Sequence, residues 1–265
     1  MPLEGFLTML ATRENTLIHP YLWEDPYESV IQNSVVDVTE NRRISIKEDF
    51  HTKNWYGQCW SYTQESDGLW RNFTHNKEVR CVKIQTTIDA LKRSLHKYSK
   101  IDDDFYMGDV AYGSPLKEEF PKTVQEVIRR WEDMVAIETR EQHIHFIELA
   151  LLMTKREAFR YENEFRLIVY RNQPDEEANA WSYDINVNSF IKDVEFDPWT
   201  KPYQEKNFKK LIKDLGYNGP ARTSPLYAEE GLRDKKQDDE TEPFYIFKSY
   251  YPTERNLRNY ENSLA

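Results

Sequence analysis

The sequence has few cysteines and no long apolar run, and each absence excludes a class of protein. Cys59 and Cys81 are the only two cysteines in 265 residues. That is too few for a disulfide framework or a cysteine-rich metal site, so we expect both to be small buried residues in strands. No apolar stretch approaches the roughly 20 residues that a membrane-spanning helix needs. Residues 1–16 also lack the basic region and apolar stretch of a secretion signal. We therefore expect a cytoplasmic protein without membrane association.

The common phosphate-binding loops are missing as well. Neither GxGxxG nor GxxxxGK[ST] occurs among the 8 glycines. A nucleotide, if one binds, must therefore be held by another architecture. The metalloprotease pattern HExxH is absent, and His143 and His145 lie two residues apart, which points them in different directions on a helix. We predict no metal site.

Basic residues are outnumbered, with 36 Lys and Arg against 46 Asp and Glu, and the formal net charge is −10. Such a field repels polyanions and gives no general attraction to nucleic acid or anionic lipid. Residues 201–213 are locally rich in lysine, but Phe208, Leu211 and Ile212 recur at helical spacing. This pattern favours a helix with a solvated basic face over a phosphate-binding track.

Aromatic residues, by contrast, are abundant, with 7 Trp, 17 Tyr and 13 Phe. Each ring buries a large apolar area and can leave a polar tip in water, so the chain can form a full core. The sequence contains no internal repeat or proline-rich linker, and its length suits one large domain. We predict a single domain, residues 1–265, with a flexible charged loop at residues 228–243.

Strand and helix patterns follow one another without regular alternation. Aromatic and β-branched residues predict strands at 55–62, 79–85, 162–170, 191–196 and 244–251, with a hairpin-like stretch at 181–185. Apolar residues at helical spacing predict helices around 69–73, after the capping-box-like Thr86–Asp89, from Pro121 to about Phe159 with a break near residues 138–142, and at 203–215. A helical block between groups of strands indicates an α+β fold with a central mixed or antiparallel sheet.

Opposite charges are concentrated in the predicted strand that begins at Glu162. Alternate side chains of a strand share a face and lie roughly 6.5–7 Å apart, so Glu162, Glu164 and Arg166 are expected on one face. Neighbouring carboxylates raise each other's pKa and an adjacent arginine lowers it. The patch could therefore hold one stabilising carboxylate and one proton-transfer group. The structural alternative is an edge strand with a solvated charged face, or a Glu–Arg ion pair that only holds the fold.

Two other segments carry chemistry that suits a pocket. Residues 18–28 include His19 and the dipeptide Asp25-Pro26, which is typical of a helix-capping turn with aromatic packing. Residues 58–72 place Ser61 at the end of a strand and Trp70 in a short helix. A nucleophilic serine needs a base, and the GxSxG turn is absent, so serine-hydrolase chemistry is not predicted.

Taken together, three segments resemble a widespread bacterial family described as a domain of unknown function. They are DPYE at Asp25–Glu28, CWS at Cys59–Ser61 followed by Trp70, and KRxxFxYExExR from Lys155 to Arg166. The resemblance covers roughly residues 15–170 and continues more loosely to Ser224–Tyr227. By itself it implies no reaction.

The chain is also similar, more loosely, to mono-ADP-ribosyltransferases, which are compact α+β proteins that bind NAD without a glycine-rich fingerprint. Many carry Glu-x-Glu on a late strand or the turn before it, the spacing of Glu162 and Glu164. The resemblance implies that Glu164 holds the nicotinamide ribose and stabilises the developing positive charge, while Glu162 orients or deprotonates the acceptor. Their Ser-Thr-Ser strand has its nearest counterpart at residues 58–61, and their early-strand arginine in Arg13 or His19. The implied cofactor-binding residues are His19, Trp60, Ser61, Trp70, Arg71 and Arg166, with the tryptophans stacking on nicotinamide or adenine.

Three functions follow from these observations. The leading one is an ADP-ribosyltransferase-like or NAD-cleaving effector, acting on an unidentified macromolecule as a toxin or anti-phage defence factor. The alternative is a non-catalytic ligand- or protein-binding sensor module in a bacterial defence or stress pathway. A metal-dependent nuclease is disfavoured by the weak metal pattern and the acidic composition.

Overall fold

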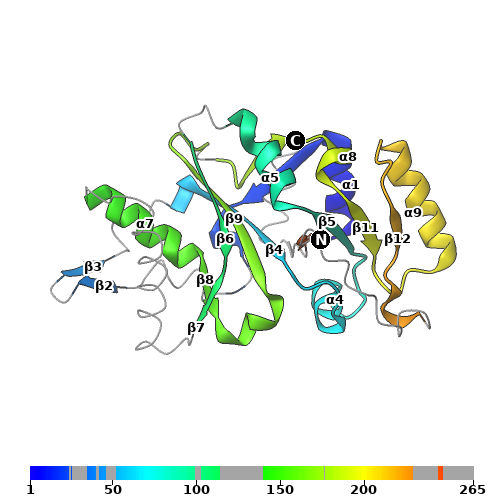
Figure 1. Ribbon diagram of the computed structural model, residues 1–265, viewed down its shortest axis with the longest axis horizontal. Helices are drawn as coiled ribbons and strands as arrows, with labels where there is room; N and C mark the ends of the chain where they lie inside the picture. The colour runs from blue at the N-terminus through cyan, green and yellow to red at the C-terminus, as the bar shows by residue number, and fades with distance from the viewer. Residues whose placement is uncertain are drawn as a thin grey trace.

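The computed structural model describes residues 1–23, 25, 35–39, 42–45, 52–98, 103–113, 140–175, 177–228 and 244–246. It confirms the α+β class, with helices arranged around a central and mainly antiparallel sheet (Figure 1). Along the longest axis of the molecule, α7 (Arg140–Leu152) lies towards one end and α9 (Pro202–Asp214) at the other. None of the described helices combines the length and apolar character needed to span a bilayer.

Nine of the described strands form the central sheet. They are β1 (Glu14–Ile18), β4 (Trp55–Ser61), β5 (Val82–Thr86), β6 (Asp103–Asp109), β9 (Glu164–Arg171), β10 (Ala180–Asp184), β11 (Asp193–Phe196), β12 (Ala221–Thr223) and β13 (Phe244–Ile246). Two small sheets pair β2 (Val35–Thr39) with β3 (Arg42–Ser45), and β7 (Ala111–Gly113) with β8 (Thr154–Arg156). The other described helices are α1 (Leu3–Thr12), α4 (Asp67–Phe73), α5 (Ile88–Leu95), α8 (Val187–Phe190) and the 3₁₀ turns η1 (Pro20–Leu22), η3 (Thr52–Asn54), η4 (His96–Tyr98), η5 (Glu157–Glu162) and η6 (Pro225–Tyr227).

The central sheet forks at β4. One edge of β4 pairs along its whole length with β9, and β9 pairs on its far side with β6. The other edge of β4 is shared, because β1 pairs with it at Gly57 and β13 pairs with it at Ser61. β1 continues to β10, and β13 continues to β5, β11 and β12. β4 and β9 therefore lie at the centre of the sheet.

Both faces of β9 are buried. Phe165, Leu167 and Val169 point into the largest hydrophobic core, as strand alternation predicts. On the opposite face, Ile168 joins Trp55 and residues of α7 in a second core. The expectation of an edge strand with a solvated charged face is therefore wrong, because β9 is an interior strand with helical cover on its charged side.

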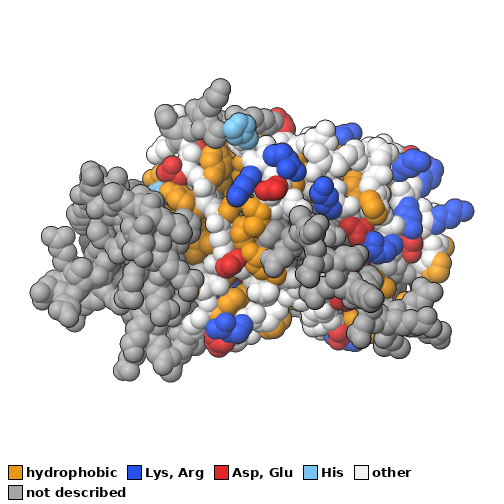
Figure 2. All heavy atoms as spheres, viewed as in Figure 1, with side chains coloured by type: hydrophobic (Ala, Val, Ile, Leu, Met, Phe, Trp, Pro, Cys, Tyr) orange, Lys and Arg blue, Asp and Glu red, His pale blue; other side chains and the backbone are white. Residues whose placement is uncertain are grey.

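Most of the expected elements occur near their expected bounds. α5 begins after Thr87, whose hydroxyl accepts the Ala90 N–H, and α9 occupies the lysine-rich segment. Lys209 and Lys210 form ion pairs with acidic residues on α9, and Lys and Arg side chains gather at this end of the molecule in Figure 2. Cys81 is buried just before β5, and Cys59 is half-buried in β4.

The long helical region expected to reach Phe159 is shorter than predicted. α7 ends at Leu152, after which β8 pairs in parallel with β7 and the chain turns through η5. The pairing of β8 with β7 thus outweighs the helical spacing of apolar residues after Leu152. The first part of that region, 121–139, and the charged loop beyond Ala228 lie outside the described residues.

Candidate active site

Glu164 and Arg166 lie on the same face of β9, as alternation predicts, and both are buried. β4 places Ser61 opposite Glu164, while β6 places Gly108 opposite Arg166. The Arg166 guanidinium lies 4.3 Å from the centre of the Trp23 ring. These charges are therefore inside the protein, beneath an aromatic cover.

The Glu162 side chain also lies beside Glu164, but, contrary to the prediction, Glu162 is not part of the strand. It is the last residue of η5 and precedes the strand, so strand alternation does not orient it. Asn163, between Glu162 and β9, has a left-handed backbone with φ 45°. Asparagine tolerates this conformation better than most residues. The left-handed turn brings the Glu162 side chain back toward Glu164.

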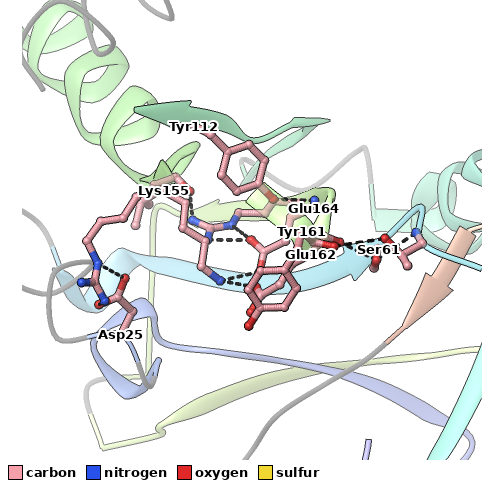
Figure 3. Close-up of polar contacts among 11 residues, drawn as sticks. Asp25, Ser61, Tyr112, Lys155, Tyr161, Glu162 and Glu164 are labelled. Atoms are coloured by element: carbon pink, nitrogen blue, oxygen red, sulfur yellow. Dashed lines mark hydrogen bonds and ion pairs between the residues drawn. The ribbon is translucent and has the colours of Figure 1, made fainter. Parts of the chain in front are cut away.

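Lys155, from β8, bridges the two carboxylates (Figure 3). Its Nζ donates to Glu162 Oε2 at 2.6 Å and to Glu164 Oε1 at 2.8 Å. All three side chains are at least nine-tenths buried. A single ammonium group thus partly neutralises two acids, an arrangement that strand spacing alone does not predict.

Arg166 contacts only one of the two acids. Its Nε and Nη2 atoms bind Glu164 Oε2 at 2.9 and 2.8 Å, while its Nη1 donates to the Leu152 carbonyl at 2.5 Å. Both oxygens of Glu164 are therefore held by cations, one by Lys155 and the other by Arg166. Glu162 shares Lys155 with Glu164, but two nitrogens of Arg166 bind one oxygen of Glu164 and no such pair is formed with Glu162.

This asymmetry separates the two acids electrostatically. Burial raises the pKa of the Glu162 carboxyl group to about 7. The positive charge of Lys155 opposes this rise, and the negative charge of Glu164 adds to it. Burial also acts to raise the pKa of Glu164, but Arg166 and Lys155 outweigh it and hold that pKa well below its usual range. Near neutral pH, Glu162 can therefore gain or lose a proton while Glu164 stays ionised.

Backbone contacts fix the position of the acids. The Ser61 hydroxyl donates to the Glu162 carbonyl at 2.5 Å, and the Glu164 N–H donates to the Tyr112 hydroxyl at 2.7 Å. Burial raises the pKa of Tyr112, and the Glu164 charge adds to this effect. Ser61 thus holds the main chain at Glu162, a positioning contact rather than that of a nucleophile.

The three segments that carry the family resemblance meet around this cluster. Asp25, the described residue of DPYE, is buried and accepts two hydrogen bonds from Arg156 at 3.0 and 2.7 Å. Lys155 belongs to the same KRxxFxYExExR segment as the two acids. The sequence indicates a helix-capping turn for Asp25 and no role for Lys155, so neither ion pair could be predicted from it. Tyr112 has no sequence signal, because it comes from a separate short strand.

The remaining predicted cofactor-binding residues are not gathered at the acids. Trp60 lies in the main core, and Trp70 points from α4 into a smaller core. Neither is more than 1% exposed, so a ligand could stack on them only if those cores opened. His19 is buried and contacts two backbone carbonyls, those of Trp55 and Ala178, through its ring nitrogens. Arg71 lies on α4, on the surface.

A cavity of about 630 Å³ lies beside the charged cluster. Tyr161, which directly precedes Glu162, forms one wall and is 51% exposed. Neither carboxylate lines this cavity, so Tyr161 separates the two acids from it. The described residues that line it are Gly68, Arg71, Asn72, His75, Asn76, Glu78 and Tyr161. Within the described ranges, no three His, Cys, Asp or Glu side chains are grouped as they would be to hold a metal ion.

Comparisons with known proteins identify no relative: no family model, no curated protein and no solved structure matches this chain.

Proposed function

We propose that the protein is an enzyme that cleaves the nicotinamide–ribose bond of NAD and transfers ADP-ribose to an acceptor or to water. The observation that carries this proposal is the asymmetric bridge, in which Lys155 contacts both acids and Arg166 pairs with Glu164 rather than Glu162. Two neighbouring carboxyl groups whose surroundings push their pKa values apart supply one ionised group and one proton-transfer group.

The two acids take different roles from those implied by the resemblance to ADP-ribosyltransferases. Both oxygens of Glu164 are held by cations, so it would have to give up a buried ion pair to bind a ribose hydroxyl. In this proposal Glu164 is a positioning residue that fixes Lys155 and, through it, Glu162. Glu162 is the catalytic residue that contacts the reacting groups.

The proposed reaction needs only NAD and an acceptor, which can be water. The C1′–N bond of NAD breaks, and its electron pair leaves with nicotinamide. An acceptor hydroxyl, amine or water attacks the resulting ribosyl cation and loses its proton to the Glu162 carboxylate. A base with a pKa near the working pH is best suited to such a transfer, and the Glu162 carboxyl group meets that condition.

Nicotinamide release from NAD tests the proposal. Glu162→Gln keeps the size of the side chain but removes the proton acceptor, so we expect at least a roughly hundredfold loss of turnover with a nearly unchanged melting temperature. Glu157→Gln, on the exposed side of η5, is the matched control and should retain activity. Absence of nicotinamide release by the unmodified protein, or full activity of Glu162→Gln, would contradict the proposal.

A second candidate function is the non-catalytic binding or sensing module. The charges of Lys155, Arg166, Glu162 and Glu164 sum to zero when all four are ionised, and their contacts join β8, η5, β9 and the end of α7. Such a cluster could serve only to hold the fold. On that reading, Glu162→Gln would lower stability as much as Glu164→Gln does.

A further inference from the structure

The wall of the cavity beside Tyr161 combines an exposed aromatic ring, a guanidinium and amide side chains. We propose that this cavity binds the adenosine phosphate half of NAD, with the base stacked on Tyr161 and a phosphate bound by Arg71. The inference rests on the proposed function and adds to it the place where the substrate's nucleotide part is held. A volume of about 630 Å³ lies within the range of small-molecule sites.

Arg71 can bind an anion without giving up its present contacts. Its Nε donates to Asp67 at 2.7 Å, and its Nη2 makes a longer contact with the Tyr227 hydroxyl at 3.4 Å. In the described part of the chain, these contacts occupy two of the five N–H donors of a guanidinium. The Arg71 side chain is 45% exposed. Planar guanidinium groups bind phosphate through two parallel hydrogen bonds.

The loop after α4 places polar side chains at the cavity, and its backbone adopts unfavourable conformations to do so. His75, Asn76 and Lys77 all have positive φ, at 45°, 53° and 83°. The loop is tied back to α4, because the Asn76 N–H donates to the Arg71 carbonyl at 2.8 Å. Successive non-glycine residues in this region are uncommon, and such conformations cluster at ligand-binding segments. His75 and Asn76 are thereby fixed beside Arg71 in the cavity wall, within reach of phosphate and base.

Tyr161 connects the cavity to the acids. Its ring lines the cavity, and it is the residue immediately before Glu162 (Figure 3). Burial raises the pKa of the Tyr161 hydroxyl, and the Glu162 carboxylate raises it further through its charge and a side-chain hydrogen bond. The Thr63 hydroxyl donates to the Tyr161 carbonyl at 3.4 Å, which links this wall to the end of β4. A nucleotide stacked on Tyr161 therefore lies one residue along the chain from Glu162, although the Glu162 carboxylate does not itself line the cavity.

Calorimetric binding of AMP, ADP-ribose, adenosine and inorganic phosphate tests the assignment. The unmodified protein should bind AMP and ADP-ribose more tightly than adenosine or phosphate. Arg71→Gln should weaken AMP binding about tenfold or more without changing adenosine binding, because only the phosphate contact is lost. Tyr161→Leu should weaken AMP and adenosine binding alike by roughly tenfold, because stacking is lost.

Two substitutions on α9 are matched controls. Lys210→Gln breaks an exposed ion pair four residues apart, like that of Arg71, and Tyr203→Leu removes an exposed ring that is 62% accessible. Both variants should bind all four probes as the unmodified protein does. Equal binding of phosphate and AMP, no binding of either nucleotide, or equal losses in the controls would overturn the assignment.

The proposed function and this inference can fail separately. Glu162→Gln should bind AMP with unchanged affinity, since it alters the acid rather than the cavity. If nucleotides bind as described but NAD is never cleaved, the cavity stands and the catalytic proposal fails. If NAD is cleaved while Arg71→Gln and Tyr161→Leu keep the original KM, the catalytic proposal stands and the cavity assignment fails.

Discussion

Glu164 forms ion pairs with two buried cations, Lys155 and Arg166. Glu164→Gln would remove the carboxylate that takes part in both of these buried ion pairs, whereas Glu162 takes part only in the pair with Lys155. Breaking a buried pair in this way costs about 3–5 kcal/mol. We expect a loss of that size in the free energy of unfolding, measured by denaturant titration at pH 7. Glu157→Gln, which removes half of an exposed pair, should cost less than about 1 kcal/mol. Equal losses in the two variants would show that the buried network is not stabilising.

Glu162 should give stability a distinct pH dependence. Its pKa rises from the ordinary 4.5 to about 7 on folding. The stability that this shift contributes is present below about pH 4.5 and is lost as the pH rises through about 7. The free energy of unfolding of the unmodified protein, relative to Glu162→Gln, should therefore fall between pH 5 and pH 8. Subtracting the variant removes the titration of other groups, so a constant difference would contradict the raised pKa.

The identity of the two acids and of Arg166 could be predicted from the sequence, but their geometry only in part. The period of two correctly placed Glu164 and Arg166 together. The same alternation does not apply to Glu162, because the left-handed backbone of Asn163 separates Glu162 from β9, which begins at Glu164. The role of Lys155 could not be predicted, since it depends on the pairing of β8 with a strand some forty residues earlier.

The junction between η5 and β9 depends on one backbone conformation. Asn163, at φ 45°, turns the chain so that both acids reach Lys155. A residue with a Cβ and no polar side chain pays about 1–2 kcal/mol in this region, whereas glycine adopts it freely. Asn163→Ala should therefore lower the free energy of unfolding by about 1 kcal/mol or more, and Asn163→Gly by clearly less. The same denaturant titration measures both, and a glycine variant as unstable as the alanine variant would argue against the backbone explanation.

Elements with strong local signals could be predicted, and those that depend on distant partners could not. α5 has a threonine cap and an apolar stripe, and β4 has a run of aromatic residues, so both occur where expected. β8, with the sequence Thr-Lys-Arg, has a single residue that favours strands and forms because β7 lies beside it. The burial of the charged face of β9 likewise depends on distant parts of the chain, because α7 and Trp23 cover that face.

At the scale of the whole molecule, the protection of backbone amides against hydrogen exchange should decrease from the centre of the sheet to its edge. β9 has a paired strand on each side and buried side chains on both faces, whereas β12 is a half-buried edge strand. Local opening takes the least free energy where few buried contacts must be broken. Hydrogen exchange followed by mass spectrometry should therefore find amides at 164–171 the slowest and those at 221–223 much faster. Comparable rates in the two segments would contradict a core centred on β4 and β9.

The position of β13 has a consequence for how the protein is made. In the sheet that the structure describes, this short strand lies between β4 and β5 and pairs with both. During synthesis from the N-terminus, β4 and β5 leave the ribosome long before residues 244–246. Until those residues follow, each nascent chain presents two open backbone edges to its neighbours, and such edges promote aggregation. Slow translation of the last part of the chain would lengthen that exposure.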